Sequence, residues 1–143
     1  MPYWRYYFHF VWAVKGRQPL ITDTVEALLF PAIANKVREL GGQCIAVNGT
    51  EDHIHLVTTV PPRISTADFV GQVKGSSSYI VSNHLDTDFS WQAGYGGLSF
   101  GERDLKAVTH YVQNQKIHHA NQKTRAIWET FTDDNDGPPP IGN

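Results

Sequence analysis

The sequence predicts an α+β fold of the ferredoxin-like (RRM-like) class, an antiparallel sheet with helices on one face and a further C-terminal helix. Segments with strand-like alternation and segments with helical spacing follow one another as strand, helix, strand, strand, helix, strand and helix. Two split β-α-β units in this order make a four-stranded sheet whose middle strands are the first and the third.

Residues 3–14 form the first predicted strand, because aromatic and β-branched residues dominate and alternate between two sides. One side carries Tyr6, Phe8, Phe10 and Trp12. Residues 15–19 break the strand with Gly and Pro, and two cations there, Lys15 and Arg17, could contact phosphate.

The first helix is predicted from Asp23, which with Glu26 forms a capping signature, to the glycine pair at 41–42. Residues 43–48 then read as a short strand and residues 49–52 as a tight turn. The second arm of this hairpin runs from residue 53 to 60 and ends at two prolines.

The second helix is predicted to start at Ser65 and to be interrupted at Gly71 and Gly75. Its middle contains Lys74 followed by a glycine and the hydroxyls of Ser76, Ser77 and Ser78. This run suits contact with a phosphate backbone, but it suits close helix packing equally well, and propensity favours packing.

A fourth strand is expected over residues 89–92 and 95–100, with a possible fifth, and several glycines allow a bend before the last helix. That helix is predicted from Glu102 to His119 as one continuous pattern. Trp128 and Phe131 could dock a short extension behind it.

The 143 residues suit one domain with a substantial core and are too few for two ordinary domains. No apolar run approaches the ~20 residues of a membrane helix and no signal-peptide pattern opens the chain, so we expect a cytoplasmic protein without a membrane partner. We expect a single domain over 1–132 and a disordered, acidic and proline-rich tail over 133–143.

The net charge of −2 argues against binding of nucleic acid through a broad basic surface. Three of the acidic residues, Asp133, Asp134 and Asp136, belong to the predicted tail, and without them the net charge would be +1. The body of the protein is therefore nearly neutral and could still hold a strand of nucleic acid in a local groove.

His53 and His55 are the first candidate site residues. Side chains alternate across a strand, so the two imidazoles share one face while Ile54 and Leu56 point to the other, which is apolar enough for a core. A histidine pair alone is a weak sign of metal binding, because most such pairs are structural. No Cys, Asp or Glu follows at the spacing of a structural zinc site.

Tyr111 and Gln115 lie four residues apart in the last predicted helix and would share a face, with Cβ atoms about 6 Å apart. This places a possible nucleophile beside a possible amide ligand. Two imidazoles and an amide oxygen would leave the charge of Mg²⁺ or Mn²⁺ available to polarise a phosphate. The same spacing also suits a tyrosine in the core.

These residues resemble the single-tyrosine transposases of the smallest bacterial insertion sequences, the IS200-like family of the HUH endonuclease superfamily. The segment 53–55 is similar to the His-hydrophobe-His motif of that superfamily, and residues 111–115 are similar to its nucleophile helix. The resemblance extends to residues 8–12, 74–77 and 91–96, in the same order, and covers nearly everything from Tyr3 to His119.

The resemblance implies a metal-dependent enzyme that cuts and rejoins single-stranded DNA at insertion-sequence ends. Tyr111 would attack a phosphate to give a 5′-phosphotyrosine and a free 3′-hydroxyl, and His53, His55 and Gln115 would hold Mg²⁺ or Mn²⁺. It also implies a homodimer in the bacterial cytoplasm that recognises DNA hairpins near the element ends, with the tyrosine helix able to complete the partner's site. The candidate DNA contacts are Lys15, Arg17, Lys74, Ser76 and Ser77.

Two other functions stay open. A domesticated relative would cut dispersed hairpin repeats instead of its own mobile element. A non-catalytic module of the same fold would bind single-stranded nucleic acid through exposed sheet aromatics, although it would leave the alignment of His53 and His55 with Tyr111 unexplained. The acidic tail also departs from the family pattern, which puts a C-terminal DNA contact in doubt.

Overall fold

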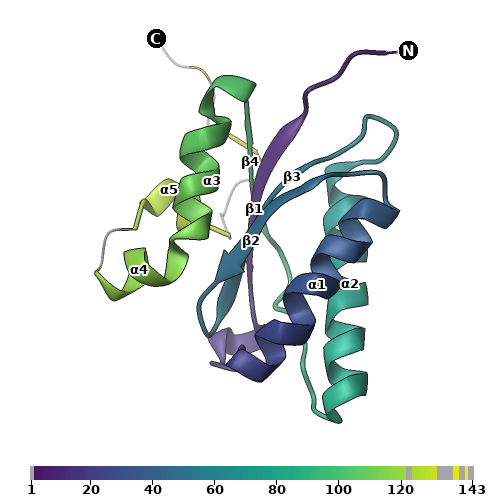
Figure 1. Cartoon of the computed structure of the whole chain (residues 1–143), viewed down its shortest axis with the longest axis vertical. Helices are drawn as coiled ribbons and strands as arrows, with labels where there is room; N and C mark the ends of the chain where they lie inside the picture. The colour runs from purple at the N-terminus through teal and green to yellow at the C-terminus, as the bar shows by residue number, and fades with distance from the viewer. Residues whose placement is uncertain (1, 122–123, 132–136, 139–140, 142–143) are drawn as a thin grey trace.

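The computed structural model describes residues 2–121, 124–131, 137–138 and 141. It contains a four-stranded antiparallel sheet in the order β2-β3-β1-β4 (Figure 1). The strands are β1 (Tyr7–Ala13), β2 (Cys44–Gly49), β3 (His53–Thr59) and β4 (Gly96–Phe100). The first and third strands lie in the middle, which confirms the predicted ferredoxin-like arrangement.

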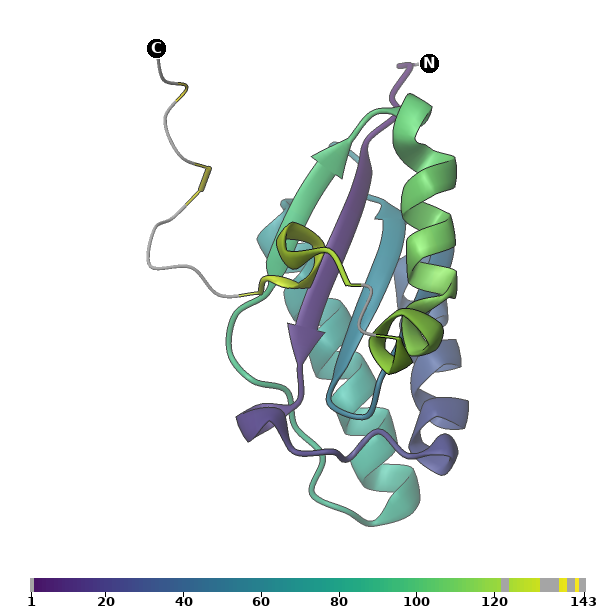
Figure 2. The same cartoon turned by 90° about the vertical axis from the view of Figure 1, so that its left-hand side faces the viewer.

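Helices cover both faces of this sheet. The long helices α1 (Asp23–Glu39) and α2 (Thr66–Leu85) pack on one face, and the C-terminal helices lie on the other (Figures 1 and 2). The C-terminal helices are α3 (Leu105–Gln113), α4 (Gln115–Ala120) and α5 (Ala126–Glu129), and two short 3-10 helices complete the set, η1 (Lys15–Arg17) and η2 (Glu102–Asp104).

The two faces of the sheet differ in chemistry. Beneath α1 and α2, side chains such as Phe10, Trp12, Ile54 and Leu56 form the main core. The opposite face carries His9, His53 and His55, which lie beside a smaller apolar cluster around Val108 and Val112 of α3. The alternation predicted for the first and third strands is therefore observed, with the imidazoles on the face that α3, α4 and α5 cover.

Several boundaries differ from the predictions. The N-cap of α1 is Thr22, whose Oγ1 accepts a hydrogen bond from the Val25 N–H, instead of Asp23. Helix α2 is uninterrupted, because Gly71 and Gly75 both lie on its exposed side and buried apolar residues hold the opposite side. The strand expected over 89–92 is reduced to a single bridge between Trp91 and Val14.

The last predicted helix is broken in two at Asn114, which has φ −107° and ψ 23°. The side-chain amide of Asn48 donates to the Gln113 carbonyl at 3.0 Å. Lys116 lies just after the break, and its Nζ donates to the side-chain Oδ1 of Asn48 and to Oε1 of Glu26, each at 2.7 Å. These contacts with β2 and α1 stabilise the break and fix α4 beside the β2–β3 turn.

Two glycines permit close approaches that position the C-terminal face. A Cβ at Gly49 would collide with the His53 carbonyl, so the β2–β3 hairpin closes tightly only with glycine there. A Cβ at Gly96 would collide with the Thr130 carbonyl, so the chain after α5 passes directly against β4. Both glycines therefore lie where backbone must approach backbone.

No helix among the described residues is long and apolar enough to cross a membrane. The predicted tail over 133–143 lies outside the described residues except for positions 137, 138 and 141. The predicted extension at Trp128 is present as the single turn of α5, which lies over β1 and β4 (Figure 2).

Candidate metal and nucleophile site

The site begins on the central strand β3. His53 and His55 project from it toward the C-terminal helices, and their side chains are buried. A third imidazole, His9 of the neighbouring strand β1, places its Nε2 2.8 Å from Nδ1 of His55. Because Nδ1 of His55 is engaged in this way, its Nε2 is the nitrogen that faces the site.

Glu129 of α5 lies at the centre of the site. Its Oε1 is 3.1 Å from Nε2 of each of three histidines, His53, His55 and His119. Its Oε2 accepts hydrogen bonds from Tyr111 Oη and, at 3.3 Å, from Gln115 Nε2. One carboxylate therefore joins the imidazoles on one side to the phenol and the amide on the other.

Tyr111 is 4% exposed. Its Oη donates to Glu129 and accepts from the backbone N–H of Arg125 at 3.0 Å. Its ring stacks on His118, with 4.9 Å between ring centroids, and meets the edge of Trp128 at 4.7 Å. Burial, together with the hydrogen bond to the Glu129 carboxylate, raises the pKa of Tyr111 to about 12.

Gln115 begins α4 just after the helix break and is fully buried. Its Nε2 faces Glu129, but its Oε1 has no hydrogen-bond partner among the described residues. A buried carbonyl oxygen without a partner is costly and rare. Such an atom has the chemistry of a free metal ligand.

The charges of the site are coupled. Burial opposes the ionisation of Glu129, yet hydrogen bonds from His53 and His55 hold the pKa of this carboxyl well below its usual range. Burial would lower the pKa of His53, but hydrogen bonds with Glu129 and Asp52 outweigh burial and raise it. Burial lowers the pKa of His55 and lowers that of His9 to about 3, so both rings are neutral near pH 7.

Four side chains form a group that could hold a metal ion, with ligand atoms within 4.8 Å of one another: His53, His55, His119 and Glu129. The sequence predicted His53, His55 and Gln115 as ligands and Tyr111 as nucleophile, and the structure brings all four of these to Glu129. Sequence reasoning missed His9, His119 and Glu129. The four-residue spacing between Gln115 and His119 was a signal for His119, whereas nothing local marks Glu129.

None of the predicted DNA contacts has a hydrogen bond to Glu129 among the described residues. Lys15 and Arg17 are exposed on η1, and Arg17 pairs with Asp52 at 3.2 Å. Lys74 donates to the carbonyls of Gln92 and Gly94 at 2.8 and 2.9 Å.

The two predicted serine contacts also belong to α2. Ser77 is fully buried, where it donates to the Lys74 carbonyl and accepts from Trp91 Nε1, and Ser76 beside it is half-buried. Lys74 and Ser77 therefore hold the segment 91–94 against α2. Helix α2 lies on the face of the sheet opposite to the site.

The chain is similar in sequence and in fold to several known proteins. A family model described as "Transposase IS200 like" matches residues 2–115. Two relatives are transposases for insertion sequence element IS200, from Salmonella typhimurium and Salmonella typhi. Each is 29% identical over 124 residues, which cover 78% of this chain and 78% of the relative.

Two solved structures share the fold. One is the crystal structure of a candidate transposase from Deinococcus radiodurans R1, with a TM-score of 0.64 and 24% identity over 80% of this chain and 95% of that one. The other is a REP-associated tyrosine transposase bound to a REP hairpin, with a TM-score of 0.62 and 14% identity over 89% of this chain and 78% of that one.

Proposed function

The chain belongs to the IS200-like transposase family, and from this premise we propose that it cuts and rejoins single-stranded DNA at insertion-sequence ends. Tyr111 is the proposed nucleophile. His53, His55 and Gln115 are the proposed ligands of a divalent ion, Mg²⁺ or Mn²⁺. In the terms of the superfamily this is an HUH endonuclease with one tyrosine.

The observation that carries this proposal is the position of the Glu129 carboxylate. One of its oxygens faces three imidazole nitrogens, and the other faces the Tyr111 hydroxyl and the Gln115 amide. An anion thus lies between the proposed ligands and the proposed nucleophile. A phosphate in transit between a metal ion and an attacking tyrosine needs the same placement.

The proposed reaction is a transesterification. Tyr111 Oη forms a bond to phosphorus while the bond from phosphorus to the 3′ oxygen breaks, and the phenol proton ends on that 3′ oxygen. The products are a 5′-phosphotyrosine and a free 3′-hydroxyl, so the reverse attack by another 3′-hydroxyl rejoins the strand without a nucleotide cofactor. A bound divalent ion would supply positive charge that polarises the phosphate and favours the phenolate.

The residues present suit such an ion. His53 and His55 offer Nε2 atoms, and Gln115 offers an Oε1 that no described group uses. His119 lies on the same helix as Gln115 and is positioned to add a further imidazole. His9 supports the set, because its contact with Nδ1 of His55 keeps Nε2 directed at the site.

The partner we propose is DNA that carries hairpins near the element ends, bound by a homodimer. Tyr111 lies against His55 of its own chain, and this contact supports a proposal in which one chain supplies both the nucleophile and the ligands. Lys15 and Arg17 are the proposed phosphate contacts outside the site, since both are exposed at the end of β1. Lys74, Ser76 and Ser77 belong to α2, so they could contact DNA only if the DNA also passed over the face of the sheet that α1 and α2 cover.

The test is formation of a covalent adduct. The protein is incubated with single-stranded oligonucleotides that carry both ends of its element, with Mn²⁺ or with EDTA, and adducts are resolved by denaturing electrophoresis. We expect an adduct only with the metal and none from Tyr111→Phe, whereas Tyr79→Phe, at an exposed tyrosine of α2, should behave as wild type. An adduct with Tyr111→Phe would refute the assignment of the nucleophile.

A further inference from the structure

The residues next to Glu129 suggest what binds beside the phosphate. Trp128 precedes it in α5, and its indole lies over His9, with 6.0 Å between centroids and planes at 83°, as well as against the ring of Tyr111. An aromatic double ring and an anion are thus held side by side by consecutive residues. A nucleotide offers the same pair, a planar base next to a phosphate.

With Trp128 and Glu129 in place, the site is closed to substrate. Trp128 covers the ring of Tyr111, the Arg125 N–H occupies the phenol oxygen, and Tyr111 is almost completely buried. A DNA strand reaches Tyr111 only after these two side chains have left. The space that they vacate is then the space that the nucleotide enters.

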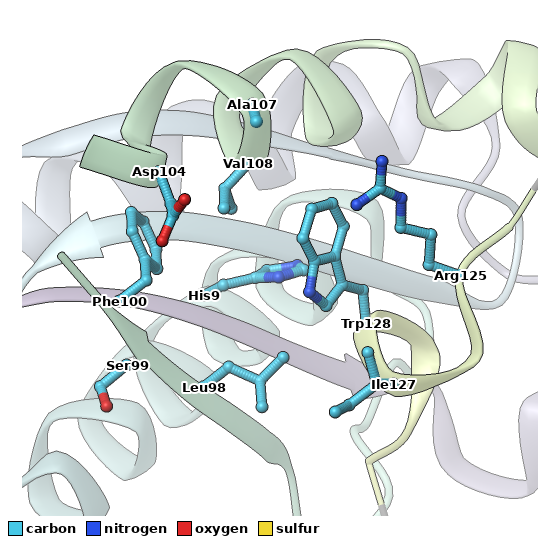
Figure 3. Close-up of a pocket in the computed structure, with 10 residues that line it drawn as sticks. All are labelled: His9, Leu98, Ser99, Phe100, Asp104, Ala107, Val108, Arg125, Ile127 and Trp128. Atoms are coloured by element: carbon cyan, nitrogen blue, oxygen red, sulfur yellow. The ribbon is translucent and has the colours of Figure 1, made fainter. Parts of the chain in front are cut away.

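The space available to a base comprises the volume of the indole and an open cavity next to it. A cavity of about 260 Å³ adjoins Trp128 and is bounded by His9, Phe100, Val108 and Asp104. Figure 3 shows Phe100 and Trp128 on either side of His9, with Val108 of α3 on the third side. The walls are mainly apolar and aromatic, which suits stacking of a base.

His9 adds a group that can read a base. It is 2% exposed, and its Nδ1 has no hydrogen-bond partner in the described part of the chain. In Figure 3 the nitrogen-bearing edge of this ring is turned toward Trp128. When Nε2 of His55 serves an ion, Nδ1 of His55 keeps its proton and donates to Nε2 of His9. The proton of His9 is then on Nδ1, the buried nitrogen that has no partner in the described part of the chain.

We infer that Trp128 and Glu129 occupy a nucleotide subsite, in which one unpaired nucleobase of the DNA replaces the indole over His9, next to the cavity that Phe100 helps to line. The base belongs to the nucleotide whose 5′-phosphate replaces the Glu129 carboxylate. Nδ1–H of His9 donates to an acceptor on the edge of this base. The inference rests on the proposed function, because that function places the phosphate beside Tyr111.

The probes for a binding test are the four deoxynucleoside 5′-monophosphates and deoxyribose 5-phosphate, which lacks the base. Calorimetric titration of the full chain, in Mn²⁺ and in EDTA, gives the affinity for each. We expect Trp128→Ala to raise the ratio of nucleotide affinity to sugar-phosphate affinity by at least about fivefold, the lower end for stacking of a base on an aromatic side chain. An unchanged ratio overturns the subsite.

Two matched variants separate charge from space. Glu129→Gln removes the competing charge but keeps the indole, so it should tighten both kinds of probe equally and leave their ratio unchanged. Tyr79→Ala, at an exposed aromatic residue on the other face of the sheet, should change neither affinity. A rise in the ratio with Glu129→Gln as large as that with Trp128→Ala would contradict the assignment of the base site to the place of the indole.

A second measurement does not depend on affinities. In Trp128→Ala protein with ¹⁵N-labelled histidine, a deoxynucleoside monophosphate should shift the Nδ1 resonance of His9, and deoxyribose 5-phosphate should not. Equal shifts from both probes would overturn the role of His9. If the adduct of the proposed function forms while the affinity ratio stays unchanged, only the subsite is wrong, and if no adduct forms, the proposed function fails whatever the ratio shows.

Discussion

The buried amide of Gln115 implies that stability and metal binding oppose each other at this position. Its Oε1 is buried without a hydrogen-bond partner in the described chain, and its Nε2 makes one long bond of 3.3 Å to Glu129. An unsatisfied buried polar group costs about 1–3 kcal/mol, whereas an ordinary hydrogen bond contributes about 0.5–1.5 kcal/mol. Gln115→Leu keeps the approximate volume, so the metal-free variant should be more stable than wild type by about 1 kcal/mol.

The same substitution should weaken binding of the ion. Loss of a ligand should raise the Kd for Mn²⁺ at least about tenfold, since even mutation of residues that only hydrogen-bond to metal ligands lowers metal affinity by about 10–100-fold. At a Mn²⁺ concentration 100 times the wild-type Kd, the ion stabilises wild type by about 2.7 kcal/mol. It would stabilise the variant by only about 1.4 kcal/mol under the same conditions.

Urea unfolding followed by circular dichroism, with EDTA and with Mn²⁺, measures both quantities. The control is Gln113→Leu, an exposed glutamine two residues away that should change stability by less than about 0.5 kcal/mol. If Gln115→Leu is less stable than wild type in EDTA and gains as much from Mn²⁺, then Gln115 is a structural residue and the reasoning about its free oxygen is wrong.

Three further predictions concern pH, the core and the cations. The pKa of His53 is raised above its ordinary 6.5, and a proton on this ring competes with the ion. As the solution is acidified, the affinity for Mn²⁺ should therefore begin to fall while the pH is still above about 6.5. An affinity that stays constant down to that pH and falls only below it would refute this prediction. Ile54→Ala should destabilise the chain by about 2–5 kcal/mol in thermal or urea unfolding, because Ile54 is fully buried in the main core. Lys15→Ala should lower the salt dependence of single-stranded DNA binding by about 0.7 in the log–log slope, whereas Lys74→Ala should leave the slope unchanged and reduce stability through its lost bond to the Gln92 carbonyl.

The sequence was informative where a pattern is local. Alternation along β3 placed Ile54 in the main core and His53 on the opposite face, and the order of elements predicted the sheet. The four-residue spacing of Tyr111 and Gln115 indicated that they lie together, although Asn48 breaks the helix between them. The four-residue spacing therefore predicted that Tyr111 and Gln115 lie close together, even though the predicted helix is divided into α3 and α4.

Contacts between distant segments were not predictable in the same way. Glu129 lies 76 residues from His53 in the chain, and no periodic pattern links them. Its position depends on the path of the chain after α4 and on the close passage at Gly96, which only the folded backbone reveals. Lys74 was ambiguous for a related reason, since the carbonyls that it binds come from a segment without regular structure.

The β2–β3 hairpin closes so tightly that a side chain at Gly49 would collide with the His53 carbonyl. This tight closure makes the register of β3 sensitive to insertions and deletions in the turn. A slip of one residue in the pairing of β3 exchanges its two faces, so both imidazoles would enter the apolar core while Ile54 and Leu56 faced Glu129. A change in the length of the turn at 50–52 that shifted β3 by one residue would therefore disrupt the core and the site together, and the pairing of β3 with β1 opposes such a shift. Because both faces of this sheet are buried, the register of β3 determines the packing of the core and the position of the site residues at the same time.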